Sequence, residues 1–399
     1  MTADRNLHEG DTRRQFLRRA GLTTFTLGGG SVLLAACGGD DEAAVKTMTS
    51  TGPAAAPSAS GRIDFLSFEA YDLPDPLKAW KAKNGVSVKP TYVGGQDEVQ
   101  TKLKAVGSSA GYDIVTYNQG FKSLYRELDI LEPLDEQKLP NLKHLFPYFA
   151  GDNGNFWVDA DGTRTGVPFT WGLNSMIVDT RRVTKTPTSW HDLLEPEFKG
   201  RVAIVDIPTD SWGVAAHVLG FTPSQVTKQD GEQVFDLLAQ IVAQSSGVSP
   251  SFGDATSKMT SGDADVCWAG WAGMNELAAA AGVTSFESVV PKEGSVSFCD
   301  AFALPKGADN VDTALAWMNE SLDPKVNADA AVSLVAGVTV KGALRHLPKT
   351  LRELYAYDDL EGLLEQAPLN DNPPVESDEF VTIEEVQRGW QEIKAGARS

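Results

Sequence analysis

The stretch RIDFLSF at residues 62–68 alternates between apolar and polar side chains, which predicts a β-strand. An amphipathic helix is predicted for residues 76–84 and a second strand, VSVKPTY, for 86–92. A further helix over 97–106 and a third strand over 112–116 follow. Strands that alternate with helices in this way predict a parallel sheet with crossover helices, and therefore an α/β fold.

The alternation continues outward from this stretch to about residue 345. Strands are predicted at 166–168, 172–178, 202–206, 265–268, 286–290 and 296–304, and helices at 121–128, 190–194, 211–219, 231–244, 274–281, 313–321 and 327–336. From 347 to 396 the pattern is mostly helical, with a proline-rich break at 370–374. No internal repeat with a period of about 20–50 residues is present.

Residues 1–36 have the parts of an export signal. TRRQFLR at 12–18 is a twin-arginine motif, and residues 20–36 carry no charge but are too short and glycine-rich for a membrane-spanning helix. LAACG at 34–38 matches a bacterial lipobox, which predicts a diacylglycerol anchor on Cys37. Residues 37–60 are then expected to form a lipidated flexible tether. We expect an exported protein, in the periplasm or on the outer face of the cytoplasmic membrane.

Charge and length limit what the exported part can be. The 363 residues after position 36 are long for one core and suit two lobes. They contain 30 Lys and Arg against 51 Asp and Glu, because the leader holds five arginines and three acidic residues. This net charge of −21 argues against nucleic acid as a partner, since phosphate binding needs clustered basic charge. It favours a cationic ligand, although an acidic surface also serves solubility.

The chain offers no recognisable catalytic or metal motif. It lacks the phosphate-binding, dinucleotide-binding, zinc-protease and serine-hydrolase signatures. Its five histidines are scattered, and Cys267 and Cys299 are not spaced as a C-x-x-C pair. Whether these two cysteines form a disulfide is left open. We therefore expect no enzyme, no cofactor and no metal.

Six stretches carry a resemblance to a known family. They are FLSFEAY at 65–71, AGYDIV at 110–115, VPFTWG at 167–172, TSWHDLLEPEFKGRV at 188–202, VPKEG at 290–294 and DAFALP at 300–305. In this order they resemble segments of the spermidine/putrescine-binding proteins of ABC importers, within the larger class of extracellular solute-binding proteins. The similarity covers most of residues 62–345.

The resemblance implies a type II periplasmic-binding-protein fold, in which two α/β lobes are joined by crossing strands and hold the ligand in a cleft between them. Lobe one would comprise 61–170 plus 301–342, and lobe two 171–300 plus 343–399. The resemblance also implies a monomer that delivers a polyamine to an ABC permease with its ATPase.

A polyamine site needs carboxylates for the ammonium groups and aromatic faces for the cations and methylenes. Four segments at strand ends combine acids with aromatic residues. They supply the candidate ligand-binding residues Phe68, Glu69, Tyr71, Asp206, Asp210, Trp268, Phe298 and Asp300.

The resemblance assigns roles to part of this set. In the family, the residue that matches Trp268 stacks on the ligand, and the residues that match Asp300 and Asp210 bind its amines. Phe68 and Phe298 stand where the family has tryptophans. Asp300 is also singled out by its setting, since a carboxylate within the apolar run FCDAF is costly without a partner.

The chain departs from the family pattern at three places. Ala70 and Ile207 replace acidic residues, with Glu69 and Asp206 adjacent to them. A tyrosine expected near 120–121 is replaced by glycine or phenylalanine. These changes leave the identity and length of the ligand open. Two alternatives to a polyamine importer are another small organic solute and a sensory lipoprotein that presents its ligand to a membrane kinase.

Overall fold

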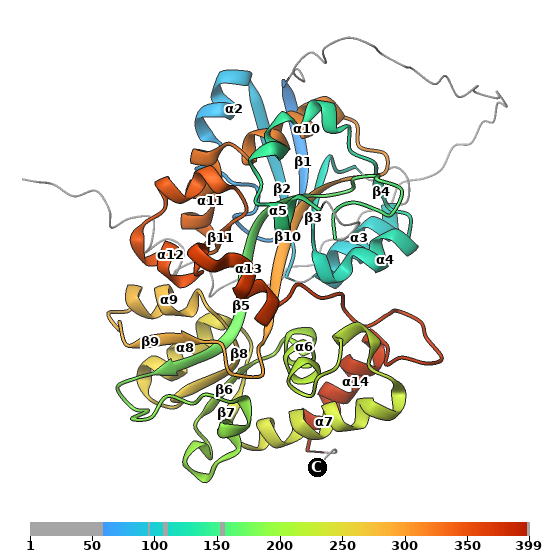
Figure 1. Ribbon diagram of the computed structural model, residues 1–399. Helices are drawn as coiled ribbons and strands as arrows, with labels where there is room; N and C mark the ends of the chain where they lie inside the picture. The colour runs from blue at the N-terminus through green and yellow to red at the C-terminus, as the bar shows by residue number, and fades with distance from the viewer. Residues whose placement is uncertain (1–58, 95, 107–110, 152–155, 397–399) are drawn as a thin grey trace, which may run out of the picture. The chain divides into compact units, whose positions relative to one another are not determined.

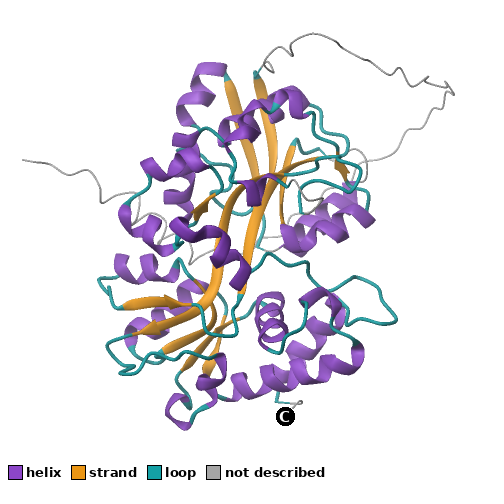
Figure 2. Ribbon diagram, in the orientation of Figure 1, coloured by secondary structure: helices purple, strands orange, loops and turns teal. Residues whose placement is uncertain are grey.

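The computed structural model describes residues 59–94, 96–106, 111–151 and 156–396. Within these ranges the strands form one mixed sheet, whose main path runs β2-β1-β3-β10-β5-β8-β6-β7 (Figures 1 and 2). The strands are β1 Gly61–Ser67, β2 Val86–Tyr92, β3 Ile114–Asn118, β4 Leu131–Glu132, β5 Val167–Asp179, β6 Val202–Val205, β7 Ser245–Ser249, β8 Val266–Trp271, β9 Phe286–Val289, β10 Val296–Pro305 and β11 Gly337–Val338.

Helices pack around this sheet (Figure 2). The α-helices are α2 Lys78–Asn84, α3 Gln96–Val106, α4 Lys122–Glu127, α5 Pro147–Ala150, α6 Pro208–Val218, α7 Lys228–Ala243, α8 Phe252–Ser261, α9 Met274–Ala280, α10 Val311–Ser321, α11 Pro324–Leu334, α12 Lys349–Leu354, α13 Leu360–Gln366 and α14 Ile383–Lys394. Short 3₁₀ turns connect them, among them η1 Gln119–Phe121 and η4 Trp190–Leu194.

The first strands and helices follow the expected order. Strand β1 pairs in parallel with both β2 and β3, so the predicted parallel α/β unit is confirmed. Strand β7 at 245–249 has no counterpart in the prediction, and the two strands predicted at 166–168 and 172–178 are one continuous strand, β5. All thirteen residues of β5 are buried, so no alternation marks it as a single strand.

Strands β5 and β10 run side by side as an antiparallel pair (Figure 1). The first half of β5 pairs with β10 and β11, and its second half pairs with β8 and β9. Because β10 also pairs with β3, these two strands belong to both ends of the sheet. They occupy the place of the crossing strands that the resemblance implies.

The apolar core is divided about the middle of β5. One cluster surrounds β1, β3 and the part of β5 up to Leu173. A second begins at Met176 and lies between β6, β8 and helices α6, α7 and α14. A third, smaller cluster packs residues of β6 and β8 against helices α8 and α9. In the C-terminal part, apolar residues from 347 to 369 pack into the first cluster and those from 381 to 393 into the second. The lobe boundaries stay a prediction, but this packing divides 343–399 between the two cores.

Two of the stretches that carry the resemblance hold each other in place. Ser189 caps η4, and its hydroxyl donates to Glu293 of the VPKEG segment at 2.5 Å. The indole of Trp190 donates to the carbonyl of Gly294 at 2.9 Å. Trp190 is fully buried, so its motif serves the local structure.

Replacement of Gly337 by alanine is expected to lower the free energy of unfolding by about 1–3 kcal/mol, the usual effect of overpacking. A Cβ at this position would overlap the indole of Trp171, which donates a hydrogen bond to Val338 O at 3.1 Å. Urea unfolding of the variant measures the loss. Gly94→Ala is the control, because a Cβ there has nothing within 4 Å; equal stability of the two variants would contradict the packing argument.

Candidate functional site

Asp300 lies in the apolar strand β10 and is only 5% exposed. Its carboxylate accepts a hydrogen bond from the Tyr71 hydroxyl at 2.6 Å and one from the Asn118 amide at 3.2 Å. Tyr71 follows the end of β1, and Asn118 ends β3. Three chain segments far apart in sequence therefore converge on this carboxylate.

The pairing register places Phe298 on the same face as Asp300. Asp300 lies opposite Thr170 and Phe298 opposite Gly172 in the antiparallel pair of β10 and β5. Residues two apart in a strand point to one face, and directly opposed residues share it. The ring of Phe298 lies over Gly172, in space that any side chain there would fill. The crossing strands thus present a carboxylate and an aromatic ring side by side.

Asp210 reaches the same face from helix α6. It lies in the first turn of α6 and is partly buried. The amide of Asn174 lies against its carboxylate, and Asn174 stands opposite Val296 on β5 and β10. We call Asp210 and Asp300, with Tyr71, Asn118, Asn174 and Phe298, the carboxylate site.

The two carboxylates are both poorly solvated and close enough to interact. Burial raises the pKa of Asp210 to about 6, against the effect of Asn174. Burial also raises the pKa of Asp300 to about 6, despite the hydrogen bonds from Tyr71 and Asn118, and the charge of Asp210 adds to the rise. No lysine, arginine or histidine in the described ranges forms an ion pair with either group.

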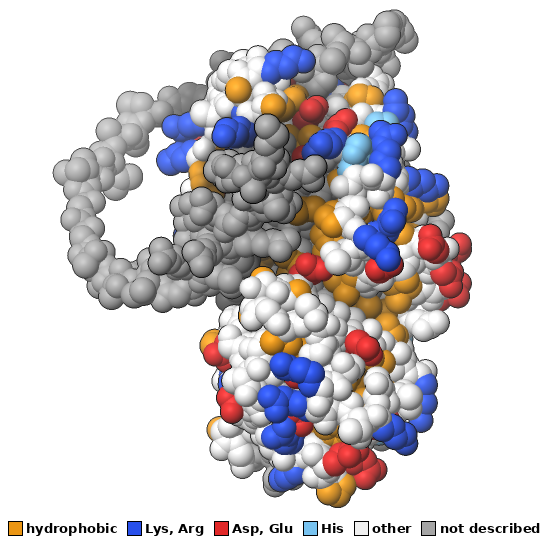
Figure 3. Space-filling view, turned by 90° about the vertical axis from the view of Figure 1, so that its left-hand side faces the viewer, with side chains coloured by type: hydrophobic (Ala, Val, Ile, Leu, Met, Phe, Trp, Pro, Cys, Tyr) orange, Lys and Arg blue, Asp and Glu red, His pale blue; other side chains and the backbone are white. Residues whose placement is uncertain are grey.

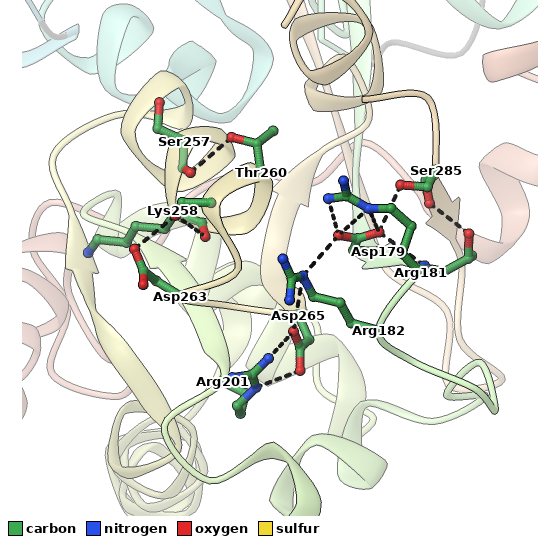
Figure 4. A network of polar contacts seen from close by, with 12 residues as sticks. Asp179, Arg181, Arg182, Arg201, Ser257, Lys258, Thr260, Asp263, Asp265 and Ser285 are labelled. Atoms are coloured by element: carbon green, nitrogen blue, oxygen red, sulfur yellow. Dashed lines mark hydrogen bonds and ion pairs between the residues drawn. The ribbon is translucent and has the colours of Figure 1, made fainter. Parts of the chain in front are cut away.

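Other buried carboxylates of the molecule show the contrast (Figure 4). Asp179 is fully buried, yet hydrogen bonds from Arg181 and Ser285 outweigh its burial and hold its pKa below the ordinary value. Asp265 is paired with Arg201. Arginines thus compensate the charge of these two structural carboxylates, and at the carboxylate site no arginine does so. An unpaired buried charge of this kind marks a candidate ligand site.

Aromatic rings border the site on the side of β1. Phe68 packs edge-on against Tyr71 with ring centroids 5.3 Å apart, and Tyr71 packs edge-on against Phe169 at 5.2 Å. Ala70, between the first two rings, has φ +70°, a left-handed conformation that non-glycine residues rarely adopt. Such strained turns are concentrated at functional sites.

The structure brings together five of the eight predicted ligand-binding residues: Phe68, Tyr71, Asp210, Phe298 and Asp300. The other three lie differently. Glu69 is exposed. Asp206 pairs with Lys394 at 2.7 Å and accepts from the indole of Trp390 at 2.6 Å. Trp268 is 1% exposed, and its ring packs on that of Trp190, 4.7 Å away in the second core.

The sequence interpretation missed Asn118 and Asn174. Asn118 ends a strand of the parallel unit, and side chains at the carboxyl ends of parallel strands commonly face a ligand. Asn174 is a polar residue within the long buried run of β5, which is a signal of the same kind as Asp300. The patterns that identified the carboxylates could therefore also have identified these two asparagines.

The described residues also bear on metal binding, on the two cysteines and on membrane-spanning helices. In the described ranges no group of three or more His, Cys, Asp or Glu residues is placed to hold a metal ion. Cys267 and Cys299 are free and buried. No helix in those ranges has the length and apolar character needed to span a bilayer. On the face shown in Figure 3, basic and acidic side chains both occur on the upper and lower parts.

Comparisons with known proteins agree with this architecture. The spermidine/putrescine-binding periplasmic protein of Salmonella typhimurium is 26% identical over 282 residues, which are 70% of this chain and 78% of that protein. The crystal structure of the spermidine/putrescine ABC transporter substrate-binding protein of Streptococcus pneumoniae superposes with a TM-score of 0.69 at 19% identity, covering 85% of this chain and 99% of that one. A Treponema pallidum lipoprotein structure gives 0.67 at 20% identity, covering 84% and 99%.

These structural likenesses show the two-lobed fold of periplasmic binding proteins, as the resemblance implied. The model of the bacterial extracellular solute-binding protein family matches residues 77–340. That match spans the crossing strands and, except for Phe68, Glu69 and Tyr71, the predicted ligand-binding residues. The chain therefore belongs to the bacterial extracellular solute-binding proteins.

Proposed function

We propose that this protein is the substrate-binding lipoprotein of an ABC importer and captures a polyamine, putrescine or spermidine, for delivery to the permease. The observation that carries the proposal is the pair of desolvated carboxylates, the partly buried Asp210 and the buried Asp300, with which no cation of the described chain forms an ion pair. A bound ammonium group would supply the missing charge. The Salmonella relative, a spermidine/putrescine-binding periplasmic protein, supports the choice of ligand.

In this proposal each residue of the carboxylate site has a defined task. Asp210 and Asp300 bind ammonium, Tyr71 and Asn118 orient Asp300, and Phe298 and Phe68 cover the ligand's methylenes. A cation on an aromatic face gains roughly 0.5–2 kcal/mol. For Glu69, Asp206 and Trp268, contact with the ligand stays a prediction.

Capture would proceed by closure of the two lobes about a hinge near Thr170–Trp171 and Ala301–Phe302. The pairing of β10 with β5 shifts register between Asp300 and Ala301, which is consistent with a bend there. The binding role is non-enzymatic and needs no cofactor. We propose a monomer that docks on a permease served by an ATPase.

Isothermal titration calorimetry at about pH 8 with putrescine, spermidine and spermine tests the ligand. Saturable heat for at least one of them is expected. If none of the three binds, the polyamine assignment fails, and a different small solute or a sensory role becomes the better reading.

Replacement of Cys37 by alanine is expected to move the protein from the membrane fraction to the soluble exported fraction, because the lipid anchor is lost. Fractionation of cells followed by detergent partitioning measures this. Cys267→Ala, which removes a buried thiol outside the lipobox, is the control and should stay with the membrane. A Cys37 variant that also stays with the membrane would contradict the anchor. Tethering matters because it raises the effective concentration of the receptor at its permease.

A further inference from the structure

A basic stretch of the chain lies outside the carboxylate site. Residues 330–352 contain no aspartate or glutamate, although the whole chain has 54 acidic residues against 35 basic ones. The stretch carries four basic residues and one histidine: Lys341, Arg345, His346, Lys349 and Arg352. Basic side chains gathered in an otherwise acidic protein indicate a surface that attracts an anionic partner.

The fold buries the apolar residues of this stretch and leaves the basic ones outside. The 3₁₀ turn η7 Lys341–His346 leads into helix α12. Side chains about four residues apart share one side of a helical segment, and those between them point elsewhere. The basic residues are exposed, and the apolar ones at this spacing are buried in the first cluster: Ala343, Leu347 and Leu351.

A second segment brings one more lysine to the same surface. Leu145 and Val340 form an antiparallel bridge, which places the end of the turn η3 Pro140–His144 beside the start of η7. Lys143, two residues before that bridge, is exposed. Basic and histidine side chains lie close together on the upper right of the molecule in Figure 3. We call the following residues the basic face: Lys143, Lys341, Arg345, His346, Lys349 and Arg352.

Most charges of the basic face have no acidic partner inside the molecule. In the described ranges Lys349 is the one member that forms an ion pair, with Glu353 at 3.4 Å, and both side chains are exposed. Arg345 donates only to the neighbouring His346, at 3.0 Å. Elsewhere in the described chain, arginines do pair with acids, as shown by Arg62, Arg126, Arg164, Arg181, Arg182 and Arg201.

The basic face also lies near the point where the described chain begins. The backbone of Ser60 hydrogen-bonds to the Thr313 hydroxyl in the first turn of α10. At the other end of α10, Asn141 of η3 forms two hydrogen bonds with Asn319. A helix of this length spans about 16 Å. The chain therefore enters the fold about one short helix away from the basic face.

The distance from this entry to the predicted anchor is limited by covalent geometry. The 22 residues from Cys37 to Ser58 can span at most about 75 Å, whatever their conformation. A lipid on Cys37 therefore keeps the basic face within reach of the bilayer that holds it. Tethering of this kind raises the effective concentration of the two surfaces, so a weak contact is enough.

We propose that the basic face docks on the anionic surface of the bilayer that carries the lipid anchor. Its guanidinium and ammonium groups would bind lipid phosphates, with the arginines in bidentate geometry. The negative net charge of the protein opposes this weakly, because charges more than about 8 Å away are largely screened at physiological salt. The contact would orient the tethered receptor on the membrane. The inference rests on the anchor proposed for Cys37 and is independent of the solute that the receptor binds.

The test uses the full-length Cys37→Ala protein, so that no acyl chain contributes to binding. Flotation measures its partition onto vesicles of phosphatidylglycerol and phosphatidylcholine in equal parts, beside vesicles of phosphatidylcholine alone. Lys341→Gln combined with Arg345→Gln removes two charges from the basic face. Lys185→Gln combined with Lys292→Gln is the matched control, because both lysines are exposed on segments that pack on the second cluster.

Binding to the anionic vesicles is expected at about 0.1 M salt, with loss of about tenfold or more at about 1 M salt, where screening is nearly complete. Phosphatidylcholine alone should not bind. A basic side chain near an anionic bilayer contributes about fivefold in affinity, so the double substitution in the basic face should weaken binding about 25-fold. The control pair should bind within about twofold of the parent, because its side chains lie outside the contact.

Absence of binding to the anionic vesicles, or equal weakening by the two pairs of substitutions, would overturn the inference. A duplex oligonucleotide that binds the protein when the vesicles do not would assign the face to nucleic acid and overturn it as well. Putrescine titrations of the same variants should give unchanged affinities. If the parent protein binds vesicles but no polyamine, the proposed ligand is wrong and the docking surface stands.

Discussion

Replacement of Asp300 by asparagine is expected to weaken polyamine binding about 100-fold or more, in the range measured when one partner of a buried charge pair is removed. The same change is expected to stabilise the ligand-free protein. Asp300 is 5% exposed and forms no ion pair. Burial raises its pKa from 3.8 to about 6, so the ionised form that predominates at neutral pH is less stable in the folded protein than it would be in water. A neutral asparagine removes that penalty, which is about 1–3 kcal/mol from the size of the shift.

Two measurements on the variant check this. Calorimetry gives the affinity, and urea unfolding without ligand gives the stability, each beside Asp263→Asn as the surface control. A loss of affinity together with a gain of stability indicates a carboxylate whose role is to bind the ligand. Unchanged affinity would remove Asp300 from the site, and a destabilised variant that still binds would mean that Asp300 is structural.

Lowering the pH from about 8 to about 5 is expected to weaken binding by about 100-fold, or tenfold for each carboxylate whose pKa is about 6. The ammonium groups of the ligand keep their charge over this range, so the change comes from the protein. Below pH 6 the carboxylates bind protons and no longer attract a cation. A pH series of titrations measures the dependence, and an affinity that is flat between these limits would contradict the raised pKa values.

Without ligand, the stability of the protein should fall as the pH rises, whereas the affinity for the ligand should increase. A carboxyl group whose pKa is higher in the folded state binds more protons folded than unfolded between about pH 4 and 6. Its contribution to stability is therefore present at low pH and lost as the pH rises through 6. The stability gained by Asp300→Asn over the unsubstituted protein should accordingly grow as the pH increases from 4 to 7.

The sequence was a good guide where local pattern decides structure. Strands β1, β2 and β3 and the helices between them follow from alternation and amphipathic spacing. Asp300 could be identified from the sequence because a charged residue in an apolar strand is costly to bury without a partner. Strand β5 was harder, since a strand buried on both faces carries no alternation, and Pro168 and Gly172 read as breaks.

The sequence could not predict which of two similar residues enters the site when a distant part of the chain binds one of them. Asp206 and Asp210 are four residues apart at the start of α6, and either suits an amine. Lys394, far along the chain, pairs with Asp206 and leaves Asp210 to the site. Trp268 similarly lies in a strand buried on both faces, so its side could not be predicted from alternation.

The most direct test of the paired carboxylates is the number of protons released on binding. Calorimetry of putrescine at pH 6, in buffers of different ionisation enthalpy, measures this number. Each carboxyl group is about half protonated there, so a bound ammonium should expel about one proton in total, falling towards zero at about pH 8. Binding at pH 6 with no proton release would contradict the account, because the ligand would then be held without Asp210 and Asp300.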